Sequence, residues 1–178
     1  MNELIYRRDT CRLCCSSTLE LVLKLKPSPI GDAYVPAEKL KEIQKSYPVD
    51  LFLCGECGHA QLIDIIDPKL LYTDYIYLTS SSLGLVEHFK KYSEEVFKEI
   101  NPPKGSLMVD IGSNDGSLLN FFKMKGMRVL GVDPARKIAL DATKRGIETL
   151  PEFFTMGLAK KIKKKVGSAM IVTANNVF

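Results

Sequence analysis

The sequence lacks any uninterrupted apolar run that approaches the roughly 18–20 residues needed to span a bilayer. Residues 1–10 carry charge but have no apolar stretch of the kind found in a secretory signal. We therefore expect a cytoplasmic protein with no membrane partner. Apolar residues make up 46% of the 178 positions and charged residues 26%, which excludes a disordered chain, a collagen-like repeat and a coiled coil. The length allows one large domain or two small ones.

The sequence also has little excess of one charge, because 25 Lys and Arg residues stand against 21 Asp and Glu residues. The longest basic run, residues 160–165, lies several positions from the nearest aromatic residues, Phe153 and Phe154. A nucleic-acid-binding surface more often interleaves basic and aromatic side chains. We interpret the run as a solvated helix face or turn, and expect no nucleic-acid partner.

Five cysteines form two clusters, and two pairs within them have the C-x2-C spacing typical of zinc knuckles: Cys11 with Cys14, and Cys54 with Cys57. Such clusters in a cytosolic chain favour metal binding over disulfides. Four soft thiolates suit tetrahedral Zn²⁺ and leave no open coordination position, so the predicted zinc is structural. Gly55 relieves the second turn sterically.

Several alternatives remain open for this region. The thiols could be free of metal, or one pair could be a redox pair. Cys15 could replace Cys14 as a ligand, although we favour a free thiol, and His59 is a weaker substitute ligand. The long insertion between the knuckles contains four prolines and is expected to form strands near residues 19–25 and 48–53.

Residues 74–82 are dense in hydroxyl groups and precede an amphipathic helix predicted from Gly84 to Ile100. One serine is expected to cap this helix, and His88 is expected on its surface. Capping explains one serine and leaves the other hydroxyl residues available for a phosphate-bearing ligand.

The second half begins a nucleotide-binding α/β sheet. An apolar strand at residues 107–111 is followed by a glycine turn, a helix from about Ser117, and a second strand that ends at Asp133. This order of elements is typical of folds that bind adenosine cofactors. Gly112 and Gly116 allow close approach of the backbone, and Asp133 suits a ribose diol.

The loop sequence favours S-adenosylmethionine over a dinucleotide. Asn114 replaces the middle glycine of the commoner fingerprint, and Asp110 would repel a pyrophosphate but can pair with the amino group of the methionine moiety. A sheet without any ligand is the alternative.

A helix at residues 136–145, a short strand near 147–150 and a strand at 170–172 are expected to follow. Asn175 lies at the carboxyl end of the last strand, where such sheets place their chemistry. Further strands are expected in a complete methyltransferase sheet, so this sheet looks half-built, with its fourth strand as an unprotected edge.

Together these features resemble the C-methyltransferase family that acts on nucleotide-linked deoxysugars. The matching segments, in the family's order, are Cys11-x2-Cys14, residues 47–51 with 53–62, Tyr75-Ile76-Tyr77-x2-Ser80-Ser81, residues 110–117 and residues 174–178. The resemblance implies an N-terminal zinc domain and a class I S-adenosylmethionine-dependent methyltransferase domain. In such enzymes a base removes the proton beside the ketone of a 4-keto sugar, and the enolate takes the sulfonium methyl.

By position, the resemblance implies zinc ligands, cofactor-binding residues and residues that face the nucleotide sugar. The zinc ligands are Cys11, Cys14, Cys54 and Cys57. The cofactor-binding residues are Asp110, Gly112, Ser113, Asn114, Asp115, Gly116, Asp133 and Asn175. Those facing the substrate are Tyr75, Tyr77, Ser80 and Ser81.

The sequence departs from the family by ending before its histidine-bearing segment and its C-terminal domain. The general base is therefore unknown, and we expect a fragment with little or no catalysis, served by a separate C-terminal polypeptide. The expected α/β organisation is a zinc- and substrate-binding domain (1–82), a linking amphipathic helix (83–103) and an incomplete Rossmann-like domain (104–178). The alternatives are a non-catalytic zinc-ribbon module that docks a partner protein, and a methyltransferase of another acceptor.

Overall fold

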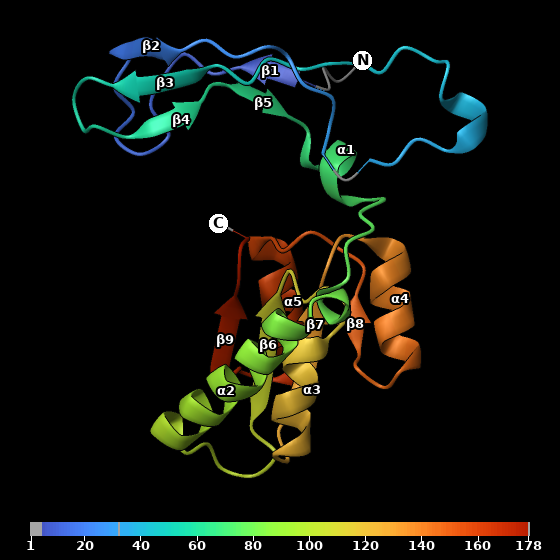
Figure 1. The fold of residues 1–178 in the computed structure, drawn as a ribbon. Coiled ribbons are helices and arrows are strands. Elements are labelled where there is room, and N and C mark those ends of the chain that lie inside the picture. Colours follow the sequence, from blue (N-terminus) through green and yellow to red (C-terminus); the bar gives the residue numbers. More distant parts are fainter. Residues whose placement is uncertain (1–4, 32, 178) are drawn as a thin grey trace. The chain divides into compact units, whose positions relative to one another are not determined.

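A computed structural model describes residues 5–31 and 33–177 of the protein (Figure 1). Phe178, which closes the last matching segment, lies outside the described residues. The chain forms two compact units, Met1–Leu71 and Tyr72–Phe178. Among the described residues, no helix combines the length and the apolar character that crossing a membrane requires.

The first unit is built from two small antiparallel sheets. Strands β2 (Leu19–Leu23), β3 (Leu51–Cys54) and β4 (Ala60–Leu62) form one sheet in the order β2-β3-β4. Strands β1 (Ile5–Arg7) and β5 (Asp64–Ile66) form the other. The strands expected near 19–25 and 48–53 are thus present with shorter bounds. A 3-10 turn, η1 (Ala37–Lys39), lies in the insertion, and α1 (Pro68–Tyr72) ends the unit.

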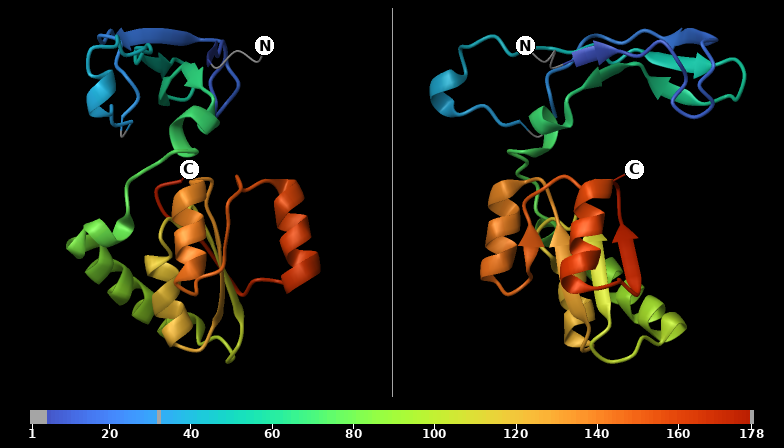
Figure 2. Two further views of the ribbon diagram at one scale, coloured as in Figure 1. Left: turned by 90° about the vertical axis from the view of Figure 1, so that its right-hand side faces the viewer. Right: turned by 180° about the vertical axis from the view of Figure 1, so that it is seen from behind.

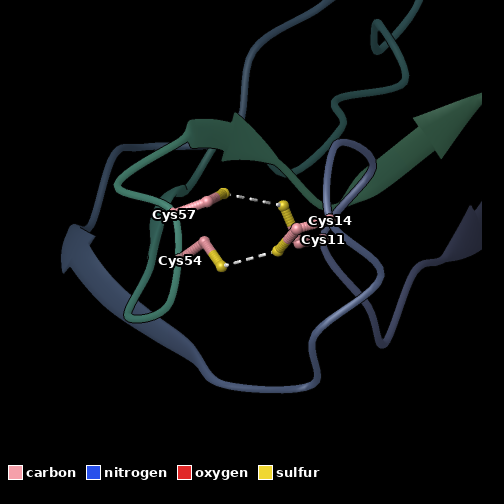
Figure 3. A group of neighbouring side chains, drawn as sticks. All are labelled: Cys11, Cys14, Cys54 and Cys57. Atoms are coloured by element: carbon pink, nitrogen blue, oxygen red, sulfur yellow. Dashed lines mark hydrogen bonds between the residues drawn. The ribbon is translucent and has the colours of Figure 1, made fainter.

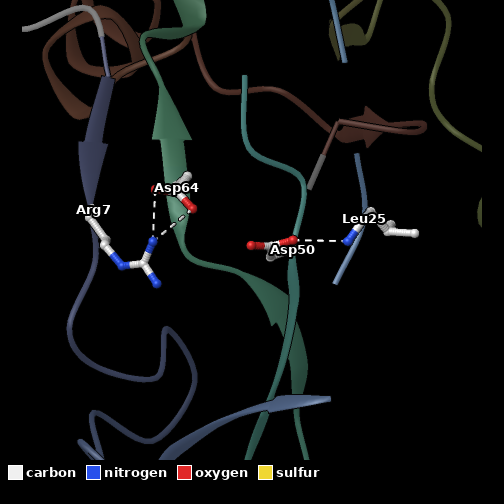
Figure 4. A network of polar contacts seen from close by, with 4 residues as sticks. All are labelled: Arg7, Leu25, Asp50 and Asp64. Carbon is white, nitrogen blue, oxygen red and sulfur yellow. Dashed lines mark hydrogen bonds and ion pairs between the residues drawn. The ribbon is translucent and has the colours of Figure 1, made fainter. Parts of the chain in front are cut away.

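Polar contacts join the strands of this unit (Figure 4). The Arg7 guanidinium lies 3.3 Å from the Asp64 carboxylate and 5.4 Å from the centre of the Phe52 ring. The N–H of Leu25 donates to Asp50 over 2.9 Å. The apolar core is small, and two of its buried residues are Cys11 and Cys54. A unit of this size commonly needs a metal or a disulfide for stability.

The second unit is a parallel sheet with helices on both faces (Figure 2). Its strands are β6 (Leu107–Ile111), β7 (Arg128–Val132), β8 (Thr149–Leu150) and β9 (Ile171–Ala174), in the order β8-β7-β6-β9. Numbered along the chain, this is 3-2-1-4, the first four positions of the doubly wound order. The helices are α2 (Leu83–Ile100), α3 (Ser117–Met124), α4 (Arg136–Lys144) and α5 (Met156–Val166).

Alternate residues of β6 pack on opposite faces of the sheet, as a strand requires. Met108 joins a cluster with Phe89 of α2 and Phe122 of α3. Leu107 and Val109 join a cluster with Leu158 and Ile162 of α5. The lysine run therefore lies on a helix, with its five lysines exposed. The α/β class and the half-built parallel sheet predicted from the sequence are confirmed.

Helix α2 belongs to the second unit, so the unit boundary differs from the expected domain limits of 82 and 103. The Ser82 hydroxyl caps the helix by accepting from the N–H of Leu85 over 3.4 Å, and η2 (Thr79–Ser81) precedes it. The periodicity of the sequence shows that α2 has an apolar face, but only the structure shows that this face packs against α3.

Candidate functional site

The four predicted zinc ligands lie together in the first unit (Figure 3). The sulfur atoms of Cys11 and Cys57 are 3.7 Å apart, those of Cys14 and Cys54 are 3.6 Å apart, and all four lie within 4.8 Å of one another. Sulfurs bound to one tetrahedral Zn²⁺ at about 2.3 Å would be separated by roughly 3.8 Å. The four thiols therefore fit a zinc ion in both chemistry and spacing.

Backbone N–H groups around the knuckles favour thiolates. The N–H of Cys14 is the main reason that the pKa of Cys11 falls from 9.0 to about 6, and the N–H of Cys57 lowers the pKa of Cys54 in the same way. Although the backbone of Ser16 favours its thiolate, the neighbouring cysteine sulfurs raise the pKa of Cys14 to about 12. Four such sulfurs repel one another as thiolates, and a divalent cation removes that repulsion.

The second knuckle forms because of two glycines. A Cβ on Gly55 would lie 2.9 Å from Cγ2 of Thr18, so the missing side chain leaves the turn the room that was predicted and lets Thr18 pack closely against it. Gly58 has a φ of 71°, a left-handed conformation that glycine adopts without strain.

Cys15 and His59 lie outside the four-sulfur cluster of the described residues. Cys15 is exposed and has a φ of 62°. The structure adds Gln61, whose buried side-chain oxygen accepts from the N–H of Arg12 in the first knuckle over 3.0 Å. In the sequence, Gln61 could have been singled out because it is a polar residue inside a strand that leads away from a knuckle.

In the second unit, the predicted glycine loop joins β6 to α3 at the point where the strand order reverses. Gly112 and Gly116 have φ values of 68° and 79°. A Cβ on Gly112 would lie 2.5 Å from a Val177 methyl group, and one on Gly116 would lie 2.8 Å from Ile147. Both positions must therefore be glycine, because the left-handed turns and the close packing of Val177 and Ile147 against the loop leave no room for a side chain.

Asp133 follows β7 and is bonded to this loop. One carboxylate oxygen accepts from the N–H of Asn114 over 2.7 Å, and the other accepts from the N–H of Ala135 over 2.8 Å. Burial raises the pKa of Asp133, although these two hydrogen bonds act to lower it. Each oxygen keeps a second lone pair that can accept from a hydroxyl group.

Asp110 is buried in β6, where its carboxylate accepts from the Thr173 hydroxyl of β9 over 2.6 Å. Burial raises its pKa to about 7, and the charge of Asp133 adds to the rise while Thr173 opposes it. Sequence reasoning missed Thr173, although a polar residue inside an otherwise apolar strand is a usable signal. The two acids predicted to hold the cofactor thus share one electrostatic environment.

The hydroxyl-rich segment contacts the glycine loop. The N–H of Thr79 donates to the Asn114 side chain, and the N–H of Ser80 donates to the Asp115 carboxylate, each over 2.9 Å. Burial raises the pKa of Asp115, but hydrogen bonds from Ser117 and Ser80 outweigh it and lower the pKa overall. The structure therefore brings this predicted substrate segment to the predicted cofactor loop.

The remaining predicted residues divide into two groups. The Tyr75 and Tyr77 rings are in contact, with centres 6.4 Å apart, and the Ser81 hydroxyl donates to the Leu78 carbonyl over 2.6 Å. Ser113 and Asn175 have buried side-chain polar atoms for which no hydrogen-bond partner is found among the described residues. A Cβ on Gly131 would clash with the Ser113 hydroxyl oxygen, so that hydroxyl lies against β7.

Comparison with known proteins found a family model that matches the cysteine-containing segment and a relative that matches the whole chain. Residues 11–72 match a family of domains described as "Putative zinc binding domain". Over its whole length the chain is 30% identical to C-methyltransferase NovU of Streptomyces niveus, and it spans 42% of that relative's length. The structure of the plantazolicin methyltransferase BpumL in complex with S-adenosylhomocysteine (SAH) matches 40% of the chain at a TM-score of 0.28 and 20% identity, over 29% of its own chain.

Residues 11–72 thus match a zinc-binding domain, and the four thiols within this range are those that the structure brings together. Over its whole length the chain is similar to a C-methyltransferase, as the resemblance drawn from the sequence predicts.

Proposed function

We propose that this chain is the N-terminal portion of an S-adenosylmethionine-dependent C-methyltransferase that acts on a nucleotide-linked 4-keto deoxysugar. The observation that carries the proposal is the loop from Asp110 to Gly116, which lies where the strand order reverses and is bonded to Asp133. Open α/β sheets bind their ligands at this place. The similarity of the whole chain to part of a C-methyltransferase supports the same reaction class.

In this proposal the loop and the two acids hold the cofactor, which supplies a sulfonium methyl group when bound. The backbone of the loop from Gly112 to Gly116 receives the methionine moiety, and Asp133 accepts from the ribose hydroxyls. Asp110 pairs with the amino group of the methionine moiety. A cation beside a buried carboxyl group stabilises the charged form of that carboxyl. The unpaired side-chain amide of Asn175, at the carboxyl end of β9, is a further donor for the same ligand.

The zinc ion would be held by Cys11, Cys14, Cys54 and Cys57 and would stabilise the small first unit. Four protein thiolates leave no position for a substrate, so the metal would take no part in the chemistry. The five cysteines are all free thiols, which agrees with a reducing compartment such as the cytoplasm.

The acceptor would meet the segment that contains Tyr75, Tyr77, Ser80 and Ser81, because that segment is bonded to the cofactor loop. Aromatic rings and hydroxyl groups suit the base and the phosphates of a nucleotide sugar. No residue is assigned as the general base, and we expect little or no methyl transfer from this chain by itself.

A separate C-terminal polypeptide is the protein partner that we propose, and β9 is the place it would join. Val172 in β9 is 58% exposed and Met170, just before the strand, is 53% exposed, and β9 pairs only with β6 within the described sheet. An exposed edge strand of this kind is a template for further strand pairing. The proposal includes no nucleic-acid or membrane partner.

Two parallel titrations test the cofactor class. The zinc-loaded chain is titrated with SAH and, in parallel, with NAD, and Asp133→Asn is the matched variant. We expect the wild-type chain to bind SAH and not NAD. We expect the affinity of the variant for SAH to be roughly tenfold lower, because the variant has lost a charged hydrogen-bond acceptor. Preference for NAD would contradict the assignment.

A second experiment tests the acceptor. With SAH bound, the chain is titrated with a nucleoside-diphosphate 4-keto sugar, and the triple variant Tyr77→Ala, Ser80→Ala, Ser81→Ala is compared with the wild type. We expect the triple variant to bind the sugar nucleotide more weakly while SAH binding is retained. Equal binding by both proteins would remove the acceptor assignment and leave the cofactor assignment in place.

A further inference from the structure

We propose that the side chains of Asn114 and Asp115 link the cofactor loop to residues 77–80, so that cofactor binding orders the segment that faces the acceptor. The inference rests on the proposed function, since it concerns the same site. It assigns these two side chains a positioning role that neither the loop motif nor the comparisons give them.

The Asn114 side chain binds the segment as a neighbouring strand would. Its amide nitrogen donates to the Tyr77 carbonyl over 2.9 Å, and its oxygen accepts from the N–H of Thr79 over 2.9 Å. Both bonds are made to backbone groups two residues apart, so they fix the path of the chain and do not depend on its side chains. Thr79 is buried at this point.

Asp115 adds a second attachment one residue further along. One of its carboxylate oxygens accepts from the N–H of Ser80 over 2.9 Å, and the other accepts from the Ser117 hydroxyl over 2.6 Å. Since Ser117 begins α3 and Ser80 is the middle residue of η2, this buried carboxylate joins η2 to the start of α3. Bonds to an ionised acceptor are stronger than neutral ones.

The same residue, Asn114, also contacts the acid proposed to hold the ribose. Its backbone N–H donates to Asp133 over 2.7 Å, while its side chain binds the segment. A continuous set of hydrogen bonds therefore runs from Asp133 through Asn114 to Tyr77 and Thr79. A ligand that fixes Asp133 and the loop will also reduce the freedom of that segment.

The sequence of the loop agrees with this role. Asn114 has a φ of 49°, a left-handed conformation that glycine adopts freely and that asparagine tolerates better than most residues. A glycine here would keep the turn but would lose all contacts with residues 77 and 79. The replacement of the middle glycine of the commoner fingerprint is thus explained by the segment that the amide binds.

Amide hydrogen exchange of the full 178-residue, zinc-loaded chain, measured with and without saturating SAH, tests the inference. We expect SAH to slow exchange at Thr79 and Ser80 by about fivefold or more, because a coupling of this kind is typically worth at least that factor. Unchanged exchange at these amides, with SAH bound, would overturn the inference and leave the proposed function standing. Failure of SAH to bind the wild-type chain would overturn both.

Asn114→Gly provides the decisive variant, because it keeps the left-handed turn and the N–H that binds Asp133. At SAH concentrations that saturate the variant, whatever its affinity, we expect the effect of SAH on Thr79 to disappear and the effect on Ser80, which Asp115 still binds, to become smaller. Asn101→Gly is the matched control: Asn101 ends α2 with a φ of 43° and lies outside the loop, so the effect should persist. Persistence of the effect in Asn114→Gly would contradict the proposed role.

A more conservative variant, Asn114→Asp, keeps the oxygen that accepts from Thr79 but removes the donor to the Tyr77 carbonyl. We expect an effect of SAH intermediate between the wild type and Asn114→Gly. Slow exchange of the β6 and β7 amides in every variant shows that the sheet remains folded. An effect equal to that of the wild type in Asn114→Asp would exclude a role for the bond to Tyr77.

Discussion

Asp110 is a carboxyl group buried in a central strand of the parallel sheet, and its environment favours the protonated form. Burial raises its pKa from 3.8 to about 7. The folded chain therefore holds this proton between about pH 4 and pH 7, whereas the unfolded chain has released it. The contribution of this group to the free energy of unfolding is greatest below pH 4 and is lost as the pH rises through 7.

Asp110→Asn should therefore stabilise the protein above pH 7, since an amide does not ionise and can still accept from Thr173. The increase in the free energy of unfolding relative to the wild type should grow from near zero at pH 4 to at most about 4 kcal/mol at pH 8. Urea unfolding at several pH values measures it. Asp141→Asn is the control, because Lys144 lowers the pKa of that exposed carboxyl, so its replacement should not stabilise at high pH.

The same variant should bind SAH roughly tenfold or more weakly, because the amino group of the ligand loses a charged partner. A variant that is more stable than the wild type but binds SAH more weakly would identify Asp110 as a functional residue. A variant that is more stable and binds SAH as tightly as the wild type would show that Asp110 has no contact with the ligand.

At the scale of the element, the two knuckles form one centre only if all four thiols reach the same ion. Cys54→Ser removes a buried ligand, whereas Cys15→Ser changes an exposed thiol outside the cluster. We expect one zinc per chain in the wild type and in Cys15→Ser, and loss of zinc during purification in Cys54→Ser. Metal analysis of the purified proteins measures this, and one tightly held zinc in Cys54→Ser would exclude a four-thiolate site.

Elements with strong local patterns were predictable from the sequence. The knuckle spacing, the strand–glycine loop–helix order and the acid after β7 each depend on residues close together in the chain, and the structure places them as expected. Contacts between distant segments were not predictable. The bonds from Asn114 to Tyr77 and from Thr173 to Asp110 join residues 37 and 63 positions apart. Local periodicity likewise could not show which core the apolar face of α2 would join.

At the scale of the whole molecule, the two units are stabilised by different interactions. The first has few buried apolar residues and a cluster of thiols, whereas the second has two apolar clusters on the faces of a parallel sheet. A small metal-dependent domain loses its structure when the metal is removed. A sheet with its own core does not depend on that metal.

Treatment with a zinc chelator should therefore unfold residues 5–71 selectively. In a two-dimensional NMR spectrum, the signals of Phe52 and Gln61 should lose their dispersion, while those of Val109 and Leu130 should be retained. Re-addition of zinc should restore the first set. Loss of both sets together would show that the second unit requires the metal domain to fold.

Calorimetric titration of SAH into the zinc-loaded 178-residue chain tests the central claim most directly. We predict saturable binding of one SAH per chain, because the glycine loop, Asp133 and the carboxyl ends of β6 and β9 are all present in the described fold. A folded, zinc-loaded chain that releases no heat and shows no binding of SAH by equilibrium dialysis would contradict it.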